Sequence, residues 1–168
     1  MVCVPKDKGG LGITYLHTQN SCLLKKFLVK LHSQNAPPWH AWFRANYGWS
    51  DHRDLGDSRA SDTPTWSSIL LGLPAFRDAT AVSIGDGAST SFWLDLWLDD
   101  IPLASRFPAL FSHSRRCNIS VAKALSDSSL HLHLQPRLSA VAESELSVLV
   151  ARLSLVALDH SRNDTRTL

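Results

Sequence analysis

Three segments in the first half of the chain repeat their hydrophobic residues every three or four positions, and this spacing predicts helices. The first covers residues 19–32. The second begins at Trp39, directly after two prolines, and carries its aromatic side chains on one stripe. The third begins with Thr63 as a cap and Pro64 at the first helical position, and Pro74 interrupts it. We therefore expect a helical N-terminal half, with a polar surface loop between the second and third helices.

The pattern changes to alternation over residues 81–94, which predicts one small antiparallel β-hairpin. Its tip is Gly85-Asp86-Gly87, where glycine can take a positive φ and the aspartate can bond its own backbone. Three large rings follow within six positions, at Phe92, Trp93 and Trp97. They carry more apolar surface than a solvated hairpin needs, so we predict that these tryptophans pack the hairpin against helices.

Helical spacing returns in the last third of the chain. Residues 137–158 form an amphipathic pattern that predicts a C-terminal helix, followed by a polar tail. Before it, residues 121–125 read as a short helix and residues 130–134 alternate like a strand. The predicted fold is mainly α with one small antiparallel hairpin, an α+β arrangement that forms an irregular helical connector.

Composition narrows the class of protein. The chain has 168 residues, 44% of them hydrophobic and 19% charged, which suits one globular domain. A net charge of +2 neither requires nor excludes a nucleic-acid partner. No apolar run approaches the roughly 20 residues that span a bilayer, so we expect no membrane partner. Three widely spaced cysteines and the lack of a signal peptide favour a reducing intracellular compartment, with nucleus and cytoplasm both open.

No catalytic centre, metal site or cofactor is predicted. Asp99-Asp100 follows an aromatic residue as in polymerases, yet Ile101-Pro102 comes next and no suitably spaced upstream aspartate is evident. His131 and His133 would share a strand face, but no third ligand lies beside them. Ser, His and Asp residues are plentiful, without a Gly-x-Ser-x-Gly elbow to frame a nucleophile.

Five basic residues are candidates for contact with a nucleic-acid backbone. Lys25, Lys26 and Lys30 occupy the polar side of the first predicted helix, and Arg115 and Arg116 are adjacent later in the chain. Such a run can follow phosphates, or it can be the solvated face of a helix. Both interpretations stay open at this point.

Several blocks of sequence occur in an order that is distinctive as a set. They are Val2-Cys3-Val4-Pro5-Lys6, Gly9-Gly10-Leu11-Gly12-Ile13, Leu23-Leu24-Lys25-Lys26-Phe27, Trp66-Ser67-Ser68-Ile69-Leu70, Ile84-Gly85-Asp86-Gly87, Phe92-Trp93-Leu94-Asp95-Leu96-Trp97 and Phe107-Pro108-Ala109-Leu110-Phe111. Together they resemble the reverse-transcriptase-like polyproteins of plant non-LTR (LINE-type) retrotransposons. The resemblance is to the segment after the polymerase domain and before the zinc-binding region.

The resemblance implies a function without chemistry of its own. Residues 1–111 match the connector region that contains the predicted hairpin, and residues 112–168 match more weakly. The family's polymerase residues and zinc ligands would lie outside this chain, so none is transferred and an enzyme is not expected. The resemblance thus implies that the chain is a transposable-element remnant. In an intact polyprotein, such a connector would contact the polymerase and the zinc region. The alternative is a domesticated module that binds RNA or DNA weakly through its basic helix face.

Overall fold

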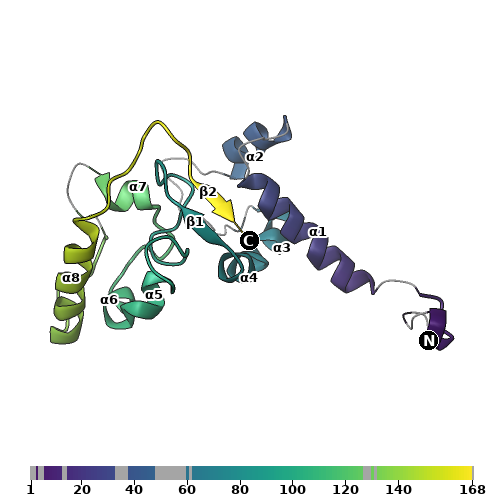
Figure 1. Ribbon diagram of the computed structural model, residues 1–168, viewed down its shortest axis with the longest axis horizontal. Coiled ribbons are helices and arrows are strands. Elements are labelled where there is room, and N and C mark those ends of the chain that lie inside the picture. The colour runs from purple at the N-terminus through teal and green to yellow at the C-terminus, as the bar shows by residue number, and fades with distance from the viewer. Residues whose placement is uncertain are drawn as a thin grey trace.

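The computed structural model describes residues 3, 6–12, 15–32, 38–47, 60, 62–126, 130 and 132–167. Helices dominate this part of the chain, and one two-stranded antiparallel sheet accompanies them, so the predicted fold class is confirmed (Figure 1). The elements are a 3-10 turn at Lys6–Lys8, α1 (Leu16–Leu31), α2 (Trp39–Tyr47), α3 (Pro64–Leu71), α4 (Leu73–Asp78), β1 (Ala81–Ser83), α5 (Leu103–Arg106), α6 (Pro108–Ser112), α7 (Val121–Ala124), α8 (Ala140–Leu153) and β2 (Thr165–Thr167).

The start of α3 and the boundary between α3 and α4 lie where local chemistry requires them. The Thr63 side chain accepts a hydrogen bond from the Trp66 N–H at 3.3 Å and so caps α3. The chain leaves α3 at Gly72, and Pro74 then lies in the first turn of α4, where its missing N–H costs no helical bond. The predicted interruption therefore divides one apolar segment into two helices.

A first hydrophobic core joins α1 to α3 and α4. Its buried members are Leu28, Leu31, Trp66, Ile69, Leu73 and Phe76. Aromatic side chains of α2 close it from one side, because the Trp39 ring stacks on Phe27 with centroids 4.6 Å apart. The aromatic stripe of the second helix is thus packed against α1.

A second hydrophobic core lies between α5, α6, α7 and α8. It contains Phe92, Trp93, Leu103, Phe107, Leu110, Ile119, Val121, Ala124, Leu132, Ala142, Leu149 and Leu153. Trp93 has no exposed surface, and its ring meets Phe92 edge to face at 5.0 Å. Trp97 is partly buried and its Nε1 donates to the Phe92 carbonyl at 2.9 Å. Both tryptophans lie in packing contacts.

The predicted hairpin over residues 81–94 is corrected in one respect, the identity of the second strand. β1 begins where the alternation predicts, but it pairs antiparallel with β2, with Val82 opposite Arg166. Residues 92–94 form turns, because the Phe92 N–H donates to Ile119 and the Thr90 carbonyl accepts from Val121. The Phe92 N–H is thus bonded to the segment that leads into α7, and β1 meets this region instead through a parallel bridge at Leu96, whose carbonyl accepts from the Val82 N–H.

The C-terminal region departs from its predicted boundaries. α8 covers 14 residues instead of the predicted 137–158, because the Ser139 side chain accepts from the Ala142 N–H and fixes the start. The predicted strand over residues 130–134 is reduced to an isolated bridge between Leu134 and Ser114, while His131 lies outside the described residues. The predicted loop over 48–62 also lies almost wholly outside them.

We predict that Trp93→Ala destabilises the fold by about 3–5 kcal/mol, because truncation of a fully buried ring leaves a cavity. Lys26→Ala, on the exposed side of α1, should change stability by less than about 0.5 kcal/mol. Chemical denaturation followed by circular dichroism measures both. Equal midpoints for Trp93→Ala and the parent chain would contradict the packing role.

Candidate functional site

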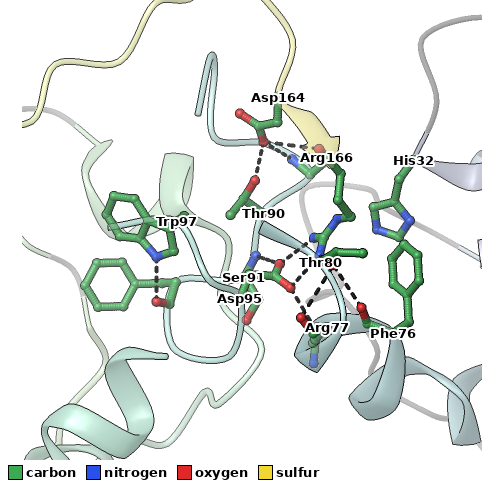
Figure 2. Close-up of polar contacts among 12 residues, drawn as sticks. His32, Phe76, Arg77, Thr80, Thr90, Ser91, Asp95, Trp97, Asp164 and Arg166 are labelled. Carbon is green, nitrogen blue, oxygen red and sulfur yellow. Dashed lines mark hydrogen bonds and ion pairs between the residues drawn. The ribbon is translucent and has the colours of Figure 1, made fainter. Parts of the chain in front are cut away.

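The loop of residues 85–90 encloses the carboxylate of Asp164, which comes from the segment just before β2. One oxygen, Oδ1, accepts from the backbone N–H groups of Gly85 at 2.8 Å and Gly87 at 2.9 Å. The other, Oδ2, accepts from the Ser89 N–H and hydroxyl at 3.1 Å each, and from the Thr90 hydroxyl at 2.7 Å. Asp164 is 6% exposed, so these donors replace water around an ionised group. We call this arrangement the carboxylate loop, and Figure 2 shows its contact between Asp164 and Thr90.

Glycine is required at both ends of the Gly-Asp-Gly turn. Gly87 has φ +70°, a conformation that side chains disfavour. A Cβ on Gly85 would overlap the carbonyl oxygens of Arg162 and Asn163, so only glycine lets the C-terminal segment approach this closely. Asp86 bonds its own backbone as predicted, since its Oδ1 accepts from the Ala88 N–H at 3.0 Å.

Burial raises the pKa of the Asp164 carboxyl, but hydrogen bonds from Gly85, Thr90, Gly87 and Ser89 more than offset this, so its pKa lies below the ordinary value. A carboxylate with a depressed pKa stabilises the fold above its unfolded-state pKa, and this contribution disappears as the pH falls through the folded-state value. Asp164 is therefore ionised at neutral pH and is held by the loop as an anion.

A second carboxylate, Asp95, is 1% exposed and lies where the two hydrophobic cores meet. Its Oδ2 accepts from the Ser91 N–H at 2.6 Å and lies 2.8 Å from Arg166 Nη2. Its Oδ1 accepts from Arg166 Nη1 at 3.0 Å and lies 3.4 Å from Arg77 Nε. Arg77 belongs to α4 and Arg166 to β2, so a single carboxylate connects the first core to the C-terminal strand.

Arg166 extends these contacts toward α4 and α1. Its Nη1 also donates to the Thr80 hydroxyl at 2.9 Å, and that hydroxyl donates to the Phe76 carbonyl at 2.9 Å. The guanidinium lies 5.2 Å from the centre of the Phe76 ring, which His32 faces from the end of α1 (Figure 2). We call Arg77, Thr80, Asp95 and Arg166 the junction cluster.

Burial lowers the pKa of His32 from 6.5 to about 4, with a further contribution from the positive charge of Arg166. Its Nδ1 lies 2.9 Å from the Leu28 carbonyl, which fits a neutral ring that donates from this nitrogen. The imidazole is therefore uncharged at neutral pH, so it packs against the Phe76 ring without adding a positive charge near Arg166 and Arg77.

The predicted basic residues lie in two separate places. Lys25, Lys26 and Lys30 are exposed on α1, which packs on α3 and α4. Arg115 is exposed after α6, and its N–H donates to the His133 carbonyl, while Arg116 is partly buried. Figure 1 places α1 and α6 on opposite sides of the junction, so no single element presents all five.

The remaining predicted motif residues make turns or internal contacts. Gly9 and Gly12 have positive φ, and Gly10 lies between them, in the turn after the first 3-10 helix. Asp99, one of the two aspartates in the polymerase-like pair, forms ion pairs with Arg152 and Arg106 and does not face an open site.

Within the described ranges no three His, Cys, Asp or Glu side chains gather closely enough to hold a metal ion. No helix in that same part of the chain is both long and apolar enough to cross a membrane.

Sequence reasoning missed the residues that complete the site: His32, Arg77, Asp164 and Arg166. The contacts of Asp164 and Arg166 join residues 71 to 86 positions apart, so no local spacing in the sequence predicts these contacts. The sequence indicates only one half of this site. The Gly-Asp-Gly turn can be predicted, but the carboxylate that its N–H groups bind lies in a short polar tail with no distinctive pattern.

Two curated proteins of Arabidopsis thaliana resemble the chain. "Putative ribonuclease H protein At1g65750" is 32% identical over 108 residues, which cover 61% of this chain and 17% of that protein. "Uncharacterized mitochondrial protein AtMg00310" is 31% identical over 101 residues, which cover 58% of this chain and 64% of that protein. No family model and no solved structure matches. The chain therefore spans less than two thirds of each relative and is similar to plant proteins, one of which is named as a ribonuclease H.

We predict that lowering the pH from 7 to 5 reduces the free energy of unfolding by about 2 kcal/mol through His32 alone. The unfolded chain takes up this proton below pH 6.5, whereas the folded chain resists until about pH 4, so the loss develops between these values. Urea denaturation of the parent chain and of His32→Gln at both pH values isolates the effect. An equal pH dependence in the two chains would show that His32 is not held neutral by the fold.

Proposed function

We propose that the chain is a non-catalytic connector from a reverse-transcriptase-like protein of a plant non-LTR retrotransposon, located between the polymerase domain and the zinc-binding region. The order of motifs over residues 2–111 and the similarity to a protein named as a ribonuclease H support this origin. The narrower position within such a protein rests on the motif order.

One observation carries the connector role: the most buried acidic residues are engaged within the fold. Asp164 is enclosed by the carboxylate loop, and Asp95 by two arginines and a backbone N–H. A catalytic carboxylate needs access to substrate or to a metal ion. These two carboxylates instead hold segments together that lie far apart in the sequence.

The junction cluster makes the connector stiff. Arg77 belongs to the helices packed around the first core, whereas residues flanking Asp95 belong to the second core. β2 is attached to the same carboxylate through Arg166. In a longer protein, the orientation of α1 relative to β2 would then be fixed by the connector instead of varying freely.

Nucleic-acid binding remains the alternative function, carried by the exposed lysines of α1. Phosphate contacts would make the affinity fall as salt rises. The test is binding of the parent chain to single-stranded RNA at several salt concentrations. Binding that weakens as salt rises, and that is lost when the three lysines are replaced by glutamate, would favour the nucleic-acid-binding module over the connector.

We predict a single narrow distance between spin labels on Cys22 and Cys117, two exposed cysteines on the two sides of the junction, in a Cys3→Ser chain. Asp95→Asn should broaden the distribution, because it weakens the pairs with Arg77 and Arg166. Asp99→Asn is the matched control, since Asp99 pairs with α5 and α8 inside the second core. Electron–electron double resonance measures all three chains.

The same purified chain should neither extend a primer nor cleave the RNA strand of an RNA–DNA hybrid under conditions in which a known ribonuclease H is active. Cleavage above background would overturn the non-catalytic part of the proposal. A broad distance distribution in the parent chain would overturn the stiff connector.

A further inference from the structure

We propose that the carboxylate loop and β1 together form a binding site for an extended Asp-x-Arg segment, and that this site accepts the segment from a second copy of the chain as well as from its own C-terminus. The inference goes beyond the connector role, because it assigns a partner to the site. The partner is the sequence Asp164-Thr165-Arg166 and the residues that flank it.

Recognition is concentrated in two side chains that alternate along one strand. Asp164 and Arg166 are two positions apart, so an extended backbone directs both to the same side. The aspartate enters the carboxylate loop, and the arginine reaches Asp95 and Thr80. Backbone pairing of β2 with β1 aligns them, which is how sheet edges bind extended peptides in general.

The segment that carries these side chains is lightly attached elsewhere. Residues 159–163 are all exposed, and two hydrogen bonds hold them near the loop: the Asp159 N–H donates to the Gly85 carbonyl, and Arg162 donates to the Ile84 carbonyl. The carbonyls of Arg162 and Asn163 also lie close to Gly85. Val156 and Leu158 still pack against the second core, so the attachment changes character after Leu158. Figure 1 shows the connection from α8 to β2 as a long segment with neither helix nor strand. Departure of the segment removes Arg166 from Asp95 and from the Phe76 ring, and a segment from a second copy restores both contacts.

A segment from a second copy would make the same contacts and would need no new surface. The intramolecular segment has the advantage of a high effective concentration, on the order of millimolar for short flexible tethers. Exchange between copies therefore becomes measurable at high protein concentration, or when the resident segment is disabled.

The first experiment offers the segment as a peptide to a full-length chain with the substitution Asp164→Ala. The probe is a fluorescein-labelled peptide of residues 159–168, followed by fluorescence anisotropy. We expect saturable binding, and binding about tenfold or more weaker for peptides carrying Asp164→Asn or Arg166→Lys, because each loses charge-assisted or bidentate hydrogen bonds. Circular dichroism verifies that the protein is folded. No saturable binding to the folded chain, or equal binding of a scrambled peptide, overturns the proposal.

The second experiment keeps the residues of both recognition contacts intact. Two chains lacking the native cysteines are mixed at millimolar concentration, one with Ala81→Cys and the other with Thr167→Cys, positions that face each other in the β1–β2 pairing. Mild oxidation should yield the mixed disulfide dimer in large excess over a control mixture of Ser83→Cys with Thr167→Cys, which is out of register. Equal yields from the two mixtures would show that the segment does not exchange between copies.

Discussion

The rest of this structure depends on the ion pairs that the buried carboxylate of Asp95 makes with Arg77 and Arg166. A charged group that is 1% exposed must be compensated, because removal from water is costly. Here Arg77, Arg166 and the Ser91 N–H supply that compensation. Since the two arginines come from α4 and β2, the compensation also determines how the first core and the C-terminal strand are placed.

Asp95 and Asp99, two acidic residues that follow Trp93, both pair with arginines inside the fold. Asp95 orders the junction cluster, while Asp99 pairs with Arg106 and Arg152 and so fastens α5 to α8. In the carboxylate loop the roles are reversed. The loop supplies the hydrogen-bond donors, and the carboxylate comes from Asp164, far away in the sequence. These carboxylates are engaged by contacts within the described part of the chain, as the proposed connector role requires.

The parts of the fold that could be predicted are those specified by neighbouring residues. Thr63 and Pro64 mark the start of α3, and Pro74 marks the break before α4, because caps and proline act within one turn of helix. The strand at Ala81–Ser83 also followed from alternation. Its partner did not, because Thr165–Thr167 is a short polar segment whose pairing depends on Asp164 and Arg166 meeting groups more than 70 positions away.

A double-mutant cycle between Asp95 and Arg166 tests the central role of the buried pair most directly, with Asp95→Asn, Arg166→Gln and the double variant compared by urea denaturation. We expect a coupling free energy of about 1.5–3 kcal/mol, in the upper part of the range for contacting residues, because both side chains are nearly inaccessible to water. The reference pair Asp99 and Arg106, with the arginine 33% exposed, should couple by less than about 1 kcal/mol. A coupling near zero between Asp95 and Arg166 would contradict the account, since the junction would then be held by the hydrophobic cores alone.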